Sequence, residues 1–129
     1  MRLAHVMLRV KNLEASIQFY RDIFNMTLLK KMDNEKYRYT LAFMGYGDIN
    51  QTTAIELTYN WDVQSYDLGN AFGHLCIEVD NVYQSCEDIK HKNGCVTREA
   101  GPVKGGSSII AFVKDPDGYQ IELIGKKVR

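Results

Sequence analysis

Apolar and polar residues alternate in several short stretches of the chain, and each such stretch predicts a β-strand. In residues 3–10, Val6, Leu8 and Val10 fall on one face of the strand, while His5, Met7 and Arg9 fall on the other. The same pattern predicts further strands at residues 27–33, 37–47, 54–60, 74–79, 95–99, 107–115 and 119–125.

A helical spacing of apolar residues follows the first strand of each half of the chain. Asn12 and Asn81 stand where the two helices should begin, and asparagine is a favoured N-cap. The expected buried stripes are Leu13, Ile17, Tyr20 and Phe24 in the first helix, and Val82, Cys86 and Ile89 in the second. The connecting segment, residues 61–73, has room for one helical turn.

The order of these predicted elements occurs twice in the chain, as in a tandem duplication. With a shift of 69 residues, His5 falls on His74 and the stretch 41–43 falls on 110–112; with a shift of 66, the Ile-Glu-Leu at 55–57 falls on that at 121–123. The sequence therefore predicts an α+β fold of two tandem βαβββ modules. We expect one domain over residues 1–129, with a first module at 1–62, a linker at 63–71 and a second module at 72–129.

Composition narrows the class of partner and the compartment. Sixteen basic and sixteen acidic side chains cancel, so no basic excess favours nucleic acid or an anionic membrane. The apolar runs are too short to span a bilayer, and the first residues lack the pattern of a signal peptide. Three cysteines without a CxxC pair are typical of reduced thiols, so we expect a cytoplasmic protein.

Each module offers one histidine on its first strand and one glutamate on its last. A single such residue in a strand is more often hydrogen-bonded or partly solvated than a ligand. Here His5 and Glu56 recur as His74 and Glu122, and a carboxylate between Ile and Leu costs several kcal/mol to desolvate unless it is paired or bound to a metal. Two imidazoles and two carboxylates suit a divalent ion such as Ni²⁺, Co²⁺, Zn²⁺ or Mn²⁺.

Five stretches resemble the short bacterial type of glyoxalase I (lactoylglutathione lyase), of the vicinal oxygen chelate superfamily: HVMLRVKNLEASIQFYRDIF, IELTYNW, GHLCIEVD, EAGPVKGG and AFVKDPDGYQIELI. The resemblance covers essentially the whole chain and implies paired βαβββ modules. The family's metal ligands match His5, Glu56, His74 and Glu122. In many longer, zinc-dependent members of the family the first metal ligand is glutamine. His5 therefore resembles the branch that prefers nickel or cobalt, with Zn²⁺ as the alternative.

The resemblance also implies a reaction and an assembly. The substrate is the hemithioacetal of glutathione and methylglyoxal, and the product is S-D-lactoylglutathione, formed by proton transfer through a metal-bound enediolate. Glu122 is the expected base, and Glu56, its counterpart, holds the ion or serves the other epimer. Sites lie between the chains of a homodimer, where His5 and Glu56 of one subunit meet His74 and Glu122 of the other.

Strand alternation and the resemblance together predict the substrate contacts. Arg9 and Asn60 lie on the ligand-bearing face of their strands, each roughly 13 Å along from His5 or Glu56, and are expected to hold the γ-glutamyl end of glutathione. Their alternative roles are a solvated strand-end charge and a turn residue. Lys104 and Gly105 are expected at the glycyl carboxylate. Other family members have an arginine near the place of Asn70, which leaves Arg98 as an alternative clamp.

The remaining candidates have simpler expected roles. Most of the nearby apolar residues are expected in the core, with some lining a wall for the substrate's methyl group: Phe43, Met44, Tyr59, Trp61 and Phe112. Cys76 is expected to pack as a small apolar residue. Three superfamily alternatives stay open: a metal-dependent thiol transferase, a bleomycin-resistance-like binding dimer, and an extradiol dioxygenase, which the short chain and fourth ligand disfavour.

Overall fold

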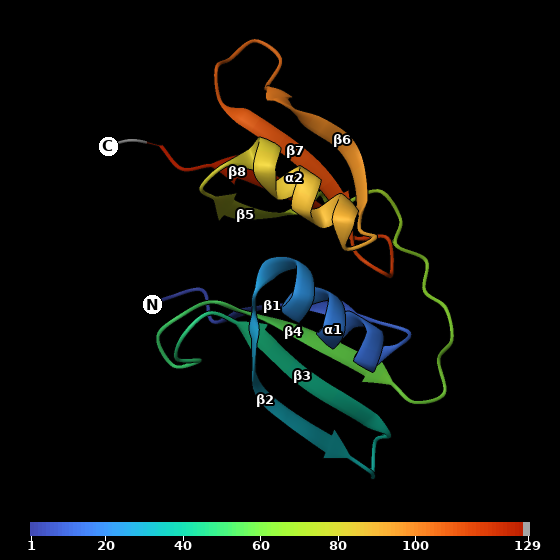
Figure 1. The fold of residues 1–129 in the computed structure, drawn as a ribbon. Helices are drawn as coiled ribbons and strands as arrows, with labels where there is room; N and C mark the ends of the chain where they lie inside the picture. Colours follow the sequence, from blue (N-terminus) through green and yellow to red (C-terminus); the bar gives the residue numbers. More distant parts are fainter. Residues whose placement is uncertain (128–129) are drawn as a thin grey trace. The chain divides into compact units, whose positions relative to one another are not determined.

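The computed structural model describes residues 1–127, which divide into two compact units. The first unit runs from Met1 to Asp67 and the second begins at Leu68. Each unit consists of a strand, a helix and three further strands (Figure 1). No helix within residues 1–127 is long and apolar enough to cross a membrane.

The first unit is a mixed four-stranded sheet with a helix packed on one face (Figure 1). In chain order its elements are β1 (His5–Arg9), α1 (Leu13–Phe24), β2 (Thr27–Asn34), β3 (Tyr39–Gly45) and β4 (Ala54–Asn60). The strand order is β1-β4-β3-β2, with β1 parallel to β4 and the other pairs antiparallel. The first and last strands of the module are therefore neighbours in the sheet.

The second unit repeats this topology. Its elements are β5 (Leu75–Val79), α2 (Val82–His91), β6 (Cys95–Pro102), β7 (Ile109–Lys114) and β8 (Gln120–Gly125). The order is β5-β8-β7-β6, again with the first and last strands parallel and the other pairs antiparallel. The predicted α+β fold of two βαβββ modules is confirmed.

Boundaries differ from the predicted ones where the backbone turns or bulges. The strand expected from residue 37 begins at Tyr39, because Arg38 adopts a left-handed conformation (φ 56°) and Tyr37 N bonds to Asn34 Oδ1. The strand expected at 95–99 continues to Pro102 across two shifts of register. Residues 61–73 hold a turn and irregular backbone, so the helical turn allowed there is not formed.

The core of each unit lies between its helix and the apolar face of its sheet. Both predicted helix stripes are buried, including Tyr20 at 0% exposure and Cys86 at 2%. Alternation on β3 buries Ala42 and Met44 completely, whereas Phe43 between them is half-buried on the opposite face. That opposite face also carries His5 and Glu56, so burial of the core leaves the candidate ligands on the other side of the sheet.

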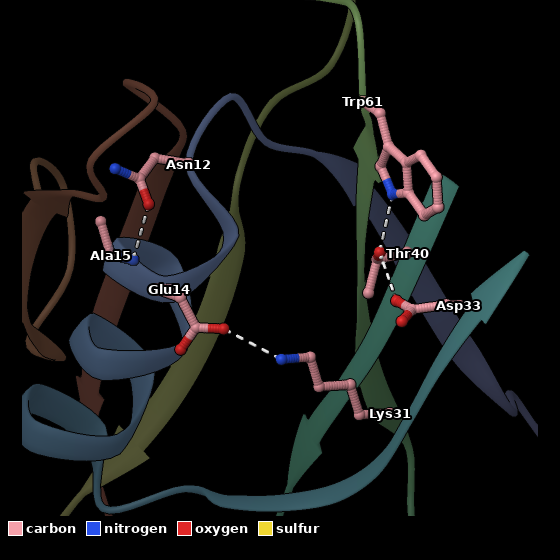
Figure 2. Close-up of polar contacts among 7 residues, drawn as sticks. All are labelled: Asn12, Glu14, Ala15, Lys31, Asp33, Thr40 and Trp61. Atoms are coloured by element: carbon pink, nitrogen blue, oxygen red, sulfur yellow. Dashed lines mark hydrogen bonds and ion pairs between the residues drawn. The ribbon is translucent and has the colours of Figure 1, made fainter. Parts of the chain in front are cut away.

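Both predicted N-caps are present. Asn12 Oδ1 accepts a hydrogen bond from Ala15 N at 3.1 Å, which Figure 2 shows at the start of α1. Asn81 Oδ1 accepts from Gln84 N at 3.0 Å at the start of α2. Each cap satisfies a backbone N–H that has no partner within the helix, and so fixes where the chain leaves the preceding strand.

A chain of hydrogen bonds fastens the end of β4 to β3 and β2. Trp61 Nε1 donates to Thr40 Oγ1 at 2.8 Å, and the same hydroxyl donates to Asp33 Oδ1 at 2.7 Å (Figure 2). Arg38 lies over the indole of Trp61, 5.4 Å from its centroid, and makes two bonds to Asp62. The hydrogen bond from Arg38 lowers the pKa of Asp62. The sequence pattern gave no sign of this network.

Replacing Thr40 by valine is expected to destabilise the protein by about 1–3 kcal/mol, because a buried hydroxyl that serves both Trp61 and Asp33 is lost. Trp61 is the single tryptophan, so its fluorescence reports the change locally. Chemical denaturation and emission spectra of Thr40→Val test this, with Thr40→Ser, which keeps the hydroxyl, as the control. Equal stability and emission for the two variants would contradict it.

Candidate metal centre

The imidazole of each module contacts the carboxylate of the same module. His5 Nε2 lies 2.7 Å from Glu56 Oε2, and His74 Nε2 lies 2.8 Å from Glu122 Oε2. No group of three or more metal-ligating side chains forms among residues 1–127. The structure thus brings together two of the four predicted ligands within each unit, in the same way both times.

Parallel pairing of the first and last strands produces this contact. On β1 and β4, His5 is the register partner of Ala54, and Glu56 follows two residues later on the same face. On β5 and β8, Leu75 pairs with Ile121, so His74 stands one position earlier and Glu122 one position later. The diagonal reach from histidine to glutamate is the same in both sheets.

The donor atoms fit a divalent ion in chemistry and in spacing. Two neighbouring ligands with bonds of about 2.1 Å at right angles lie roughly 3 Å apart, close to the 2.7 and 2.8 Å separations seen here. The glutamate side chains are largely sheltered, at 13% and 17% exposure, and the imidazoles remain accessible at 44% and 40%. Each pair is therefore a half-set of nitrogen and oxygen ligands that solvent or another ligand can reach.

Arg9 and Asn60 lie at the same end of the first sheet. Arg9 pairs with Thr58 on the adjacent strand, and Asn60 follows two residues on, so strand alternation puts both on the face that carries His5 and Glu56. Asn60 Nδ2 also donates to the Tyr66 hydroxyl at 3.1 Å, a contact that the sequence pattern did not predict. The two predicted contacts of the γ-glutamyl group are thus neighbours.

The Lys104–Gly105 segment forms an exposed turn between β6 and β7. Val103 N bonds to Ser108 O at 2.8 Å, and Gly106 N bonds to Val103 O at 3.0 Å. Gly105 has a φ of 79°, a conformation that side chains other than glycine rarely adopt. The turn leaves the Lys104 side chain exposed.

Arg98, the alternative carboxylate clamp, bonds to several backbone carbonyls of its own sheet. Its Nη1 donates to the carbonyls of Gly101 at 3.0 Å and Ile110 at 2.8 Å, and more weakly to that of Glu99 at 3.3 Å. Its Nη2 donates to Pro102 O at 2.9 Å. The acceptors are backbone carbonyls of β6 and β7 next to the two register shifts of β6. These contacts favour a structural role, and the alternative of a carboxylate clamp stays a prediction.

Replacing Arg98 by methionine, which keeps much of the aliphatic length, is expected to cost about 1–3 kcal/mol of stability. Several carbonyls of β6 and β7 would lose a charged donor. Arg98→Lys should recover only part of the loss, because an ammonium cannot span carbonyls on both strands as a planar guanidinium does. Midpoints of urea denaturation check this; a methionine variant as stable as the unmodified protein would refute the assignment.

The remaining candidates divide between core, strand end and ligand face. Met44 is buried in the core. Tyr59 and Trp61 lie at the end of β4, where Tyr59 Oη donates a hydrogen bond to the backbone carbonyl of Trp61 at 3.2 Å. Phe43 and Phe112 lie on the ligand faces, each against a histidine ring. Cys76 is exposed, so the prediction that it packs as an apolar residue is wrong; partial desolvation, with the charges of Glu122 and Glu78, raises the pKa of its thiol.

Comparison with known proteins identifies the family. Residues 2–123 match the family model of the Glyoxalase/Bleomycin resistance protein/Dioxygenase superfamily. The lactoylglutathione lyase of Neisseria meningitidis is 57% identical over 127 residues, which cover 98% of this chain and 92% of that protein. That of Salmonella typhimurium is 59% identical over 127 residues, covering 98% and 94%. The chain belongs to the glyoxalase I family.

Solved structures of the family share the fold. Glyoxalase I from Zea mays superposes with a TM-score of 0.94 at 50% identity, over 98% of this chain; the chain spans 45% of the maize protein. The trypanothione-dependent glyoxalase I of Leishmania major superposes with a TM-score of 0.87 at 40% identity, over 97% of this chain and 86% of that protein. These matches confirm the resemblance on which the predicted reaction and ligand set depend.

Proposed function

We propose that the protein is a metal-dependent lactoylglutathione lyase that converts the glutathione–methylglyoxal hemithioacetal into S-D-lactoylglutathione. One observation carries the proposal: a chain 57–59% identical to lactoylglutathione lyases keeps an imidazole–carboxylate contact at the equivalent place in both modules. A thiol transferase or a binding dimer of the same superfamily gains no comparable support from these relatives.

We infer that His5, Glu56, His74 and Glu122 hold one divalent ion, with Ni²⁺ or Co²⁺ favoured and Zn²⁺ as the alternative. When bound, the ion would supply Lewis-acid stabilisation of negative charge on the substrate's two adjacent oxygens without any redox change. Since each unit supplies one imidazole and one carboxylate, a homodimer that joins the first pair of one subunit to the second pair of the other gives two complete sites by two-fold symmetry.

The proton transfer falls to the carboxylates. Glu122 takes the proton from C1 of the hemithioacetal, the carbon that bears sulfur and hydroxyl, and returns a proton to the adjacent C2. The hydroxyl proton on the C1 oxygen passes to the C2 oxygen, so C1 becomes the thioester carbonyl carbon and C2 carries the hydroxyl, and no atom is gained or lost. Glu56, which has the same contact and similar shelter, mainly holds the ion and is the candidate base for the other epimer.

Four residues are assigned to the glutathione part of the substrate. Arg9 and Asn60, neighbours at one end of the first sheet, suit the carboxylate and amine of the γ-glutamyl group. Lys104 and the backbone of Gly105, in the exposed turn between β6 and β7, suit the glycyl carboxylate. We place the enzyme in the cytoplasm, where reduced glutathione is available and where its three free cysteines suit the redox environment.

An assay with methylglyoxal and glutathione tests the function. Protein treated with a chelator should form no thioester, and adding Ni²⁺ or Co²⁺ should restore the thioester absorbance. Trypanothione in place of glutathione tests the choice of thiol, since the Leishmania major relative is described as trypanothione-dependent. Absence of thioester with every thiol and every metal would overturn the proposed reaction.

A further inference from the structure

Each candidate metal-ligand histidine makes a T-shaped ring contact with a phenylalanine. The ring centroids of His5 and Phe43 are 5.6 Å apart with an interplanar angle of 74°. Those of His74 and Phe112 are 5.1 Å apart with an angle of 82°. Both arrangements are T-shaped, the geometry in which the edge of one ring meets the face of another.

The strand order explains why the contact occurs in both modules. Phe43 on β3 is the register partner of Glu56 on β4, and β1, which carries His5, lies on the far side of β4. Phe112 on β7 is likewise the register partner of Glu122 on β8, beside β5. Each phenyl ring therefore stands beside the glutamate and reaches past it to the imidazole.

The two rings are not part of the hydrophobic core. Ala42 and Met44, the chain neighbours of Phe43, are fully buried on the helix side, and Phe112 stands between the fully buried Ala111 and Val113. Both phenylalanines are only half-buried, on the face that carries the ligands. Packing against α1 or α2 thus does not account for an aromatic residue at these positions.

An imidazole at the start of a strand needs something to fix its orientation. Rotation about its outer torsion is broad, and a metal-bound histidine is ordinarily oriented by a contact to the part of the ring that does not face the ion. Among the described residues, each histidine meets the glutamate at Nε2 and the phenylalanine through its ring. The phenyl ring is thus the contact, besides the glutamate, that can fix the orientation of the imidazole.

We propose that Phe43 and Phe112 are positioning residues, which hold the His5 and His74 rings so that Nε2 stays directed toward the ion and its glutamate partner. This inference rests on the proposed ligand set. It assigns an apolar aromatic contact to a task that a hydrogen bond usually performs, and it applies equally to both halves of the site.

The test measures metal binding without substrate. Phe43→Leu and Phe112→Leu keep apolar bulk but remove the ring, and each is expected to bind Co²⁺ about 10-fold more weakly. Release of Co²⁺ to a chelator should be faster, and the visible absorption of the bound Co²⁺ should change. The tyrosine variants, which keep the ring, should behave like the unmodified protein. Ile110→Val, on the same face of β7 two residues from Phe112, is the matched control.

The outcomes separate this inference from the proposed function. Unmodified protein that fails to bind Co²⁺ would overturn the ligand set, and the positioning role with it. Unmodified protein that binds Co²⁺, together with leucine variants of equal affinity and identical spectrum, would overturn the positioning role alone. Leucine variants that lose only affinity for the hemithioacetal would assign the rings to the substrate wall instead. Thermal unfolding of the metal-free proteins shows whether a variant is folded, and the two positions provide independent tests.

Discussion

Replacing Glu122 by glutamine is expected to lower kcat by about 10²- to 10⁴-fold, the range that a general base contributes. The amide has the size of the carboxylate and keeps an oxygen toward the ion, but it cannot accept the C1 proton. The Glu122 side chain is largely sheltered and its ion-pair partner is the histidine of its own module, so the change should leave the fold intact. Steady-state kinetics of the metal-loaded variant, with bound metal quantified, provide the measurement.

Two matched variants make this result specific. Glu78→Gln removes a carboxylate from the same face of the same unit, on β5, and should leave kcat nearly unchanged. Glu56→Gln, at the equivalent place in the first module, should lower activity less than Glu122→Gln. Near-normal turnover of Glu122→Gln with a full complement of metal would show that another group is the base.

Two inactive variants are expected to restore each other when their subunits are mixed. One carries His5→Ala and Glu56→Ala, and the other carries His74→Ala and Glu122→Ala; each alone has no complete ligand set. In a mixed dimer, one site receives the intact first pair of one subunit and the intact second pair of the other. Since about half of randomly paired dimers are mixed and each has one complete site, roughly a quarter of the normal activity should return.

The design excludes a trivial failure. Distinct affinity tags on the two variants isolate the mixed dimers, so that absence of exchange is distinguished from absence of activity. Each variant mixed with a differently tagged copy of itself is the control and should stay inactive. Isolated mixed dimers without activity would mean that the ligands of a site come from a single chain, and the shared-site arrangement would be abandoned.

Much of the fold could be predicted from the sequence because two periodic signals agree with each other. Alternation placed His5, Met7 and Arg9 opposite Leu8 and Val10, and the duplication repeated that pattern around His74. The His–Glu contacts then follow from the parallel pairing of the first and last strands of a module. A polar residue that recurs in the corresponding apolar strand of both modules thus predicted side chains at equivalent places in the two sheets.

Features that depend on strand order or on bulges could not be predicted in this way. Alternation predicts the face on which Phe43 lies, but not which strands flank β3. The contact between Phe43 and His5 therefore could not be predicted. The sequence around Arg98 is that of an ordinary strand arginine, because its bonds to carbonyls of β6 and β7 depend on the irregular pairing of these strands. The small size of Cys76 led to the prediction that it packs as an apolar residue, although it lies exposed on the face that carries the ligands.

A crystal structure of the Ni²⁺-loaded protein, with the ion located by its anomalous scattering, tests the central claim most directly. We expect two equivalent ions per dimer, each bound by His5 and Glu56 of one subunit together with His74 and Glu122 of the other. An ion held by other side chains, or one whose four ligands all belong to one chain, would contradict the shared site proposed here.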